Sequence, residues 1–265
     1  MGEKDAFPLF DFNLAKFKSG KTPTDKKSIM QKSKSISQKK TSARLDKDYE
    51  RYFALLQQNP KGFQIFRERV FDLGFHPENF VDYECSFAAQ NIHHLHPQSI
   101  LDVGSYRHFI LGLLAHYPIT TMDVRGRSSL FTNETVLTGD AKNLALPDQS
   151  FDLVLSLCTL EHFGLGRYGD EIDFEADQKA MWEMIRVLKP GGHLIFSTTI
   201  TRANPAIGFN AHRIYSYAML YSLCTGLILK DEKYYSHRLK EFCSLEEITT
   251  DPQGWDVYCG CWQKP

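Results

Sequence analysis

Short apolar runs alternate with amphipathic stretches along the C-terminal two thirds of the chain, and this alternation constrains the fold more than any other feature. The segments with helical spacing of apolar residues are 109–116, 176–188 and 215–224. The short apolar runs, typical of buried strands, are 99–103, 120–124, 135–138, 151–157 and 193–199. Such alternation predicts right-handed crossovers and a mostly parallel sheet with helices on both faces. Residues 227–235 and 255–262 would close the sheet as two antiparallel strands, which gives an α/β fold of seven strands.

The N-terminal part of the chain has a different composition. Residues 1–44 carry eleven Lys and Arg against four Asp and Glu, and residues 18–44 have almost no large apolar side chains. Because such a stretch buries little surface, we expect 1–44 to be a flexible basic extension. Its charge fits a solvated linker or contact with a polyanion. Residues 45–97 form a predicted helical cap with a break at Asn59-Pro60, and 98–265 form the main domain.

Composition narrows the class of protein further. The formal net charge is −1 and the pI is near 6.8, which argues against a chain that coats nucleic acid. Six scattered cysteines without a Cys-x-x-Cys pair favour free thiols in the reducing cytoplasm. No apolar run approaches the roughly 20 residues of a membrane span. His93, His94 and His96 lack a convincing carboxylate or thiol partner, so we predict no metal site.

Three acidic residues end successive predicted strands. Asp102 follows the first strand and precedes Gly104, which lets the backbone approach a ligand closely. Asp123 ends the second strand, where a carboxylate can bind ribose hydroxyls, and Asp140 ends the third. Acidic residues also end strands as helix caps, but the joint spacing favours a nucleoside site at the carboxyl edge of the sheet.

The segments SILDVGS, TTMDVRG, VLTGDAKNLALPDQSFDLVLSLCTLEHF and EMIRVLKPGGHLIFS resemble class I S-adenosylmethionine (SAM)-dependent methyltransferases. The resemblance covers roughly residues 80–265 and implies a Rossmann-like fold with SAM as cofactor. It places Asp102, Gly104 and Ser105 at the methionine end of SAM. The remaining cofactor residues that it implies are Asp123 and Val124 at the ribose, Asp140 and Ala141 at the adenine, and Leu157 in the adjacent wall.

Two further segments, EHFGLGRYGD and FNAHRIY, resemble a methyltransferase-like branch described as domain of unknown function 268. The loop after Asp102 has one glycine, Gly104, where most of the superfamily has two or three. That glycine-poor loop is also a feature of the branch. Both motifs follow predicted strands, so their polar side chains are expected at the mouth of the site. The expected acceptor-binding residues are Arg167, Tyr168, Asn210 and Arg213.

The sequence therefore predicts a cytoplasmic methyltransferase acting on a small polar acceptor that bears a phosphate or carboxylate, which guanidinium groups bind well. His162 and His212 are the candidate general bases, because histidine titrates near neutral pH. Glycan or secondary-metabolite biosynthesis is a setting suggested by analogy. Two alternatives stay open: a methyltransferase for protein or nucleic acid docked through residues 1–44, and a SAM-fold module that binds without turnover. The sequence gives no indication of the oligomeric state.

Overall fold

The computed structural model describes residues 46–68 and 78–265. The chain divides into two compact units, Met1–Pro77 and Glu78–Pro265. The expected flexible extension over 1–44 lies outside the described residues. In the first unit residues 46–58 are helical and the helix ends before Asn59-Pro60. The predicted continuation is wrong for residues 63–68, which are irregular after a turn in which Lys61 and Gly62 both have positive φ.

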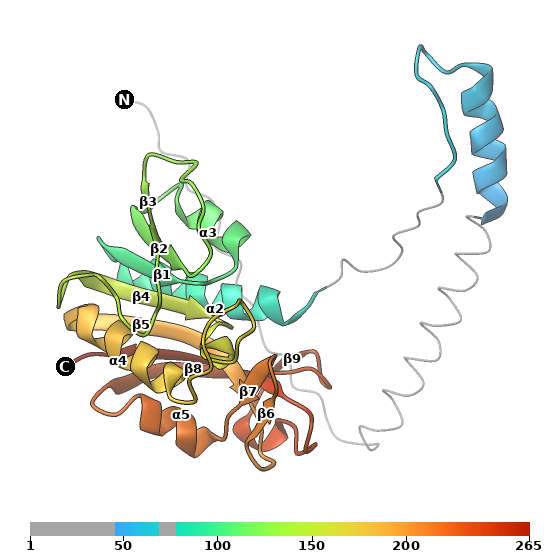
Figure 1. Cartoon of the computed structure of the whole chain (residues 1–265). Helices are drawn as coiled ribbons and strands as arrows, with labels where there is room; N and C mark the ends of the chain where they lie inside the picture. The colour runs from blue at the N-terminus through green and yellow to red at the C-terminus, as the bar shows by residue number, and fades with distance from the viewer. Residues whose placement is uncertain (1–45, 69–77) are drawn as a thin grey trace, which may run out of the picture. The chain divides into compact units, whose positions relative to one another are not determined.

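The second unit is built on one eight-stranded sheet with the order β3-β2-β1-β4-β5-β10-β8-β9 (Figure 1). Five strands are parallel, and β10, β8 and β9 continue the sheet in antiparallel fashion. The strands are β1 (Ile100–Val103), β2 (Ile119–Asp123), β3 (Glu134–Thr138), β4 (Phe151–Leu157), β5 (Leu188–Ile200), β8 (Ile228–Ser236), β9 (Glu241–Cys243) and β10 (Asp256–Gln263). The predicted α/β fold with a mostly parallel sheet is confirmed.

The sheet has one strand more than predicted, the edge strand β9. It contains three residues and carries the exposed Glu241, so it lacks the apolar run from which the other strands were predicted. Charge on a short edge strand is a usual protection against pairing with another chain. A separate hairpin pairs β6 (Ala206–Gly208) with β7 (His212–Ile214) outside the main sheet.

Helices cover both faces of the sheet, as the pattern predicts. On one face, α2 (Phe80–Leu95) and α3 (Arg107–Leu113) pack on a core that includes Ile100 and Leu155. On the other face, α4 (Ala176–Val187) and α5 (Tyr217–Leu223) pack on a core that includes Leu101, Val154 and Phe196. Neighbouring residues of one strand thus serve opposite cores, because side chains alternate across a strand.

Helix α2 starts at a capping box just inside the second unit. The Asn79 side chain accepts from the Val81 N–H, and the Asp82 carboxylate accepts from the Asn79 N–H, each at 2.8 Å. This pairing satisfies backbone donors that the first helical turn leaves free. The helix buries Phe87 and Ile92 against the sheet, so it belongs to the same compact unit as the strands.

Candidate functional site

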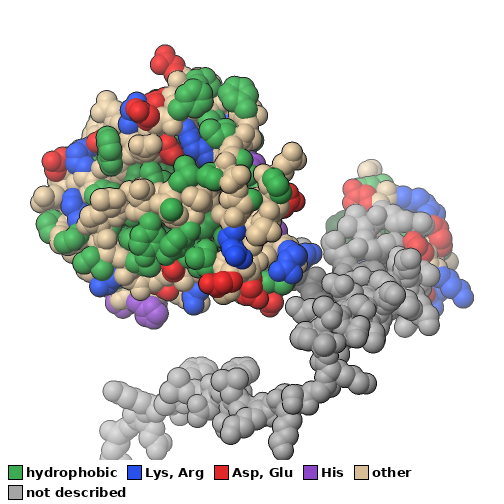
Figure 2. Space-filling view, turned by 90° about the horizontal axis from the view of Figure 1, so that it is seen from below, with side chains coloured by type: hydrophobic (Ala, Val, Ile, Leu, Met, Phe, Trp, Pro, Cys, Tyr) green, Lys and Arg blue, Asp and Glu red, His purple; other side chains and the backbone are tan. Residues whose placement is uncertain are grey.

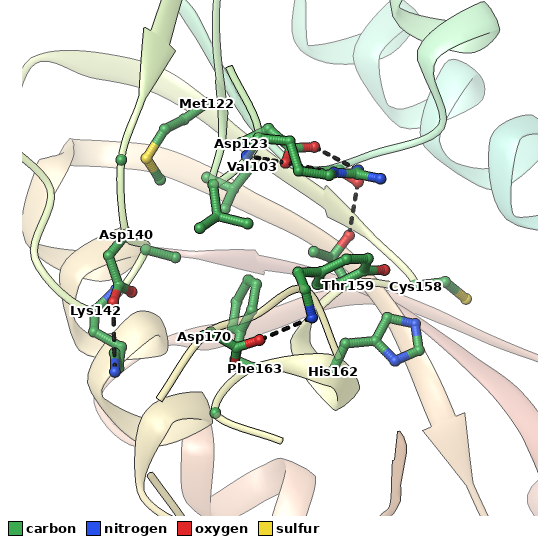
Figure 3. Close-up of a pocket in the computed structure, with 17 residues that line it drawn as sticks. Val103, Met122, Asp123, Asp140, Lys142, Cys158, Thr159, His162, Phe163 and Asp170 are labelled. Carbon is green, nitrogen blue, oxygen red and sulfur yellow. Dashed lines mark hydrogen bonds and ion pairs between the residues drawn. The ribbon is translucent and has the colours of Figure 1, made fainter. Parts of the chain in front are cut away.

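The carboxyl ends of the parallel strands meet at one edge of the sheet, where two pockets lie. The first pocket lies over the ends of β1 and β2 and the loops after β3 and β4 (Figure 3). The second extends along the loop after β1 toward α2 and the loop after β2. The residues that line both pockets are Gly104, Met122, Asp123, Arg125 and Cys158. The two pockets are therefore adjacent and are called together the cleft, and Asp123 belongs to the wall that they share.

All eight predicted cofactor residues line this cleft. The first pocket contains Val124, Asp140 and Ala141, and the second contains Asp102, Ser105 and Leu157. Gly104 and Asp123 belong to both pockets. Four different strands deliver these residues to one place, as the rule for ligand sites in open α/β sheets requires. Their individual roles in binding stay predictions.

Gly104 allows the loops after β1 and β4 to approach closely. Its φ is +72°, and a Cβ atom there would lie 2.6 Å from the Thr159 Cγ2 atom. The Thr159 hydroxyl donates to the Gly104 carbonyl at 3.0 Å. Any larger residue at Gly104 would push these two loops apart.

The two residues beside Gly104 complete this junction. The Asp102 carboxylate accepts from the Ser105 N–H at 3.3 Å, and the Ser105 hydroxyl accepts from the Leu157 N–H at 3.0 Å. Burial raises the pKa of Asp102 to about 7. The serine thus anchors the glycine-poor loop to the end of β4. This contact gives a structural reason for a serine where the wider superfamily often has glycine.

Asp123 is paired with Arg125, two residues further on. The Arg125 backbone N–H and Nε donate to Oδ1 at 2.8 and 2.9 Å, and Nη2 donates to Oδ2 at 2.7 Å. Although burial opposes the shift, these hydrogen bonds hold the pKa of Asp123 below its usual range. Both oxygens of the predicted ribose-binding carboxylate are therefore engaged by Arg125.

Asp140 lies at the other side of the first pocket (Figure 3). Its Oδ1 accepts from the Lys142 N–H at 2.9 Å, and its Oδ2 lies 3.4 Å from the Lys142 ammonium. Its side chain is 55% exposed, so Oδ2 stays accessible from the pocket. Ala141 is buried beside it.

The structure brings one of the two candidate bases to the cleft. His162 ends the short 3-10 helix η1 (Leu160–His162) and lines the first pocket. Its Nδ1 lies 2.7 Å from the Ala211 carbonyl, which assigns the proton to Nδ1 and leaves Nε2 with a lone pair. Burial lowers the pKa of His162 to about 4, so the ring is neutral near pH 7.

His212 lies on β7 and lines neither pocket. Its ring packs edge-to-face on Trp255 with centroids 5.7 Å apart, and burial lowers its pKa from the ordinary value. The expectation that two histidines face one site is therefore not met in this structure. His212 belongs to the FNAHRIY motif, which was expected at the mouth because it follows the fifth strand, whereas its ring lies against Trp255.

The four expected acceptor residues lie in different environments. Tyr168 lines the first pocket, and Arg167 is adjacent, with its Cζ 5.5 Å from the Tyr168 ring centroid. Asn210 is exposed at the turn of the hairpin and lines neither pocket. Arg213 is 5% exposed.

The Arg213 guanidinium holds the loop after η1 in place rather than facing the cleft. It donates to the carbonyls of Phe163, Asp173 and Phe174, and its Nε lies 3.5 Å from the Asp177 carboxylate. Carbonyls and a carboxylate use most of its donors, and burial excludes an incoming ligand. The expected acceptor contact for Arg213 is therefore corrected to a positioning role for this loop.

Two buried carboxyl groups behind the cleft were missed by the sequence analysis. Glu84 of α2 lines the second pocket and accepts from the Ser197 hydroxyl. Glu161 accepts from the Thr198 hydroxyl at 2.8 Å. Burial raises the pKa of Glu161 to about 7 and also raises that of Glu84. Cys158, whose φ is 45°, lines both pockets.

Two arginines of the second pocket were also missed. Arg107 and Arg127 both bind the buried Glu134, and Thr121 donates to the same carboxylate at 3.0 Å. Against the effect of burial, these donors lower the pKa of Glu134 to about 2. The Nη1 atom of Arg127 is buried without a hydrogen-bond partner among the described residues. The only sequence signal was the cluster of arginines after the second strand.

The strand order and the cleft define the class: this is the Rossmann-like fold of class I SAM-dependent methyltransferases. Residues 129–251 match the model of a family described as "Caenorhabditis protein of unknown function, DUF268". Both motifs that suggested this branch lie inside the matched range, so the predicted resemblance is confirmed. No curated protein matches the chain.

Three solved structures illustrate the likeness of fold. The [4+2]-cyclase SpnF is 19% identical with a TM-score of 0.52, covering 69% of this chain and 80% of its own. The 1,6-didemethyltoxoflavin-N1-methyltransferase of Burkholderia thailandensis, with bound S-adenosylhomocysteine (SAH), is 14% identical with a TM-score of 0.51 and coverages of 69% and 77%. N-methyltransferase NodS of Bradyrhizobium japonicum in complex with SAH is 16% identical with a TM-score of 0.50 and coverages of 69% and 86%.

Within residues 46–68 and 78–265, no helix is long and apolar enough to span a membrane. The same residues contain no group of three or more His, Cys, Asp and Glu side chains arranged to hold a metal ion.

Proposed function

We propose that this protein is a SAM-dependent methyltransferase that acts on a small acceptor bearing a phosphate or carboxylate. The observation that carries the proposal is the convergence of eight predicted cofactor residues, from four strands, on one cleft with Asp123 at its centre. Carboxylates in each pocket and in the wall that the pockets share can accept hydrogen bonds from the ammonium group, the ribose hydroxyls and the adenine amino group of SAM. Two of the fold relatives are described in complex with SAH.

The second pocket fits the amino-acid end of SAM. Arg127 lines it, and its buried Nη1 lacks a partner among the described residues, which a carboxylate would supply. Asp102 and Glu84 line the same pocket and offer carboxylate oxygens to an ammonium group. A positive and a negative partner thus lie in one pocket, as a zwitterionic amino acid requires.

The cofactor would supply an electrophilic methyl group on its sulfonium, so the protein chiefly needs to hold and orient the two reactants. His162 is neutral near pH 7, and its Nε2, 3.8 Å from the Glu161 carboxylate, carries the lone pair that accepts a proton from the acceptor. Tyr168 and Arg167 lie next to His162 at the mouth. Of the four residues expected to bind the acceptor, the proposal retains these two and leaves out Asn210 and Arg213.

A labelled-methyl assay tests the proposal. The full chain is incubated with SAM carrying a labelled methyl group and with pairs of small acceptors that differ only in a phosphate or carboxylate. We expect methyl transfer to at least one anionic member and at least roughly tenfold less to its neutral partner, equivalent to about 1.4 kcal/mol. SAH binding without transfer to any acceptor would instead support a module that does not transfer methyl groups; one fold relative is named a cyclase and not a methyltransferase.

The basic residues 1–44 favour a second candidate, methylation of protein or nucleic acid. On the face shown in Figure 2, the basic side chains are scattered among acidic and apolar ones, with no continuous basic stripe. Docking through the N-terminal tract would depend strongly on salt. Methyl incorporation into RNA or into a mixture of proteins should then fall steeply as salt rises from about 50 to about 200 mM, because phosphate contacts weaken over roughly that range. Such a fall would support this second candidate.

A cytoplasmic setting stays a prediction.

A further inference from the structure

Arg125 is hydrogen-bonded to Asp123, the carboxylate that binds the cofactor ribose in the proposed function. Its backbone and side chain supply three hydrogen bonds to Asp123. A carboxylate has about four lone-pair positions, and a ribose diol needs one on each oxygen. Ribose and the complete Arg125 pairing therefore compete, whereas the bond from the Arg125 backbone N–H can persist. Withdrawal of the guanidinium alone would leave one free position on Oδ1 and two on Oδ2.

While paired with Asp123, the Arg125 guanidinium also contacts the Tyr168 ring. The Arg125 side chain is 64% exposed, so it moves without disturbing the core. Its Cζ lies 4.8 Å from the centroid of the Tyr168 ring, and the Arg167 Cζ lies 5.5 Å from the same centroid. Both distances are within the range of cation–π attraction. A guanidinium that leaves Asp123 can therefore remain at the cleft mouth on Tyr168.

Tyr168 is held firmly enough to act as that support. Its backbone N–H donates to Asp170 Oδ1 at 3.0 Å, and the Gly166 N–H donates to Oδ2 at 3.3 Å. The Asp170 carboxylate, which also lines the first pocket, thus uses its oxygens on the backbone of the loop. Once the Asp123 pair opens, two guanidinium groups flank one ring next to the neutral His162.

We propose that Arg125 is shared between two partners: it pairs with Asp123 in the free protein, and the cofactor ribose releases it to form, with Arg167, a binding site for the phosphate or carboxylate of the acceptor. This inference rests on the proposed function. The released guanidinium has unused donors in the planar arrangement that binds such oxyanions in pairs. Cofactor and oxyanion then bind cooperatively, each strengthening the other by the same factor.

Calorimetry of the full chain tests this coupling with inorganic phosphate as the probe. Phosphate is titrated with and without saturating SAH at constant ionic strength. The proteins are the wild type, Arg125→Ala, and Arg238→Ala as a matched control, since Arg238 is exposed and lines neither pocket. For the wild type and the control we expect SAH to tighten phosphate binding roughly tenfold, within the usual range of coupling between sites.

Arg125→Ala should bind SAH roughly three- to tenfold more tightly than the wild type, because it removes the guanidinium that competes with ribose for Asp123. A gain of that size corresponds to the free energy of one exposed ion pair. It should also lose the coupling to phosphate. If SAH binds the wild type and Arg125→Ala keeps the same SAH affinity and the same coupling, the shared role of Arg125 is overturned while the cofactor site stands. Weaker SAH binding in Arg125→Ala would also overturn it, by placing Arg125 among the cofactor ligands. Absence of SAH binding to the wild type would remove the proposed function together with this inference.

Discussion

Asp102 and Ser105 meet across the tight turn after β1, where the Asp102 carboxylate accepts the Ser105 backbone N–H at 3.3 Å. Asp102 is only 4% exposed, and its burial raises the pKa of the carboxyl to about 7 against the opposing effect of this hydrogen bond. An ionisable side chain is thus kept at a buried position that favours its neutral form, a usual sign that the position serves function rather than folding.

Asp102→Asn should stabilise the protein at pH 8 and weaken SAH binding. The native carboxyl has a pKa of about 7 and keeps its proton up to that pH, whereas the unfolded one loses it near its ordinary pKa of 3.8. Because the native state then binds more protons than the unfolded state, this group's contribution falls as pH rises between these values. We expect a gain of about 1–3 kcal/mol at pH 8 and little at pH 4 from urea unfolding.

The exposed Asp148→Asn is the control for that experiment, because Asp148 is 70% exposed and lines neither pocket. It should change neither the pH dependence nor SAH affinity. Equal stability of Asp102→Asn and the wild type at pH 8 would show that the buried carboxyl carries no cost, contrary to the interpretation above.

Glu134→Gln should destabilise the second unit more at neutral than at acid pH. The side chain of Glu134 is fully buried between Arg107 and Arg127. Its pKa of about 2 in the folded protein lies below the ordinary value of 4.5, so its contribution to stability is complete above about pH 4.5 and is lost as pH falls toward 2. Breaking such a buried pair costs about 3–5 kcal/mol. Urea unfolding at pH 7 and pH 3, with the exposed Glu241→Gln as control, measures the difference.

An equal loss in Glu134→Gln at both pH values would contradict that prediction. The same variant also probes the cleft, because both arginines held by Glu134 line the second pocket. Their release should lower SAH affinity, whereas the Glu241 control should leave it unchanged.

Gly164→Ala and Gly169→Ala form a matched pair within one loop. Both glycines have positive φ, but a Cβ on Gly164 would lie 2.1 Å from the Asp173 carbonyl oxygen, whereas one on Gly169 meets no atom within 4 Å. Gly169→Ala should therefore cost about 1–2 kcal/mol from backbone strain alone. Gly164→Ala should cost roughly 1–3 kcal/mol more and increase hydrogen exchange over residues 163–174. Equal costs would mean that Asp173 does not lie against Gly164.

The strands were predictable because continuous apolar runs mark strands buried on both faces, as in β1, where every residue is buried. Edge strand β9 was not, since three residues with an exposed glutamate carry no periodicity. Residues 63–68 were misassigned for a related reason. Apolar spacing favoured a helix there, and the turn at Lys61 and Gly62 determines the path instead.

The candidate site shows a similar division. Asp102, Asp123 and Asp140 could be found because topology alone brings the ends of parallel strands together. The Arg213 guanidinium donates to carbonyls 39 to 50 residues earlier in the chain, and no local sequence pattern reveals such partners. Arg125 is close to Asp123 in the sequence, but the conformation of the folded loop decides whether their side chains pair.

Titration of the full chain with SAH, compared with Asp123→Asn, tests the cofactor site most directly. Among the described residues, Asp123 is the only carboxylate that lines both pockets. We expect the wild type and Asp148→Asn to bind SAH with equal affinity, and Asp123→Asn to bind at least roughly tenfold more weakly, a loss of about 1.4 kcal/mol. No heat of binding with the wild type, or equal binding by Asp123→Asn, would contradict the assignment of this cleft to SAM.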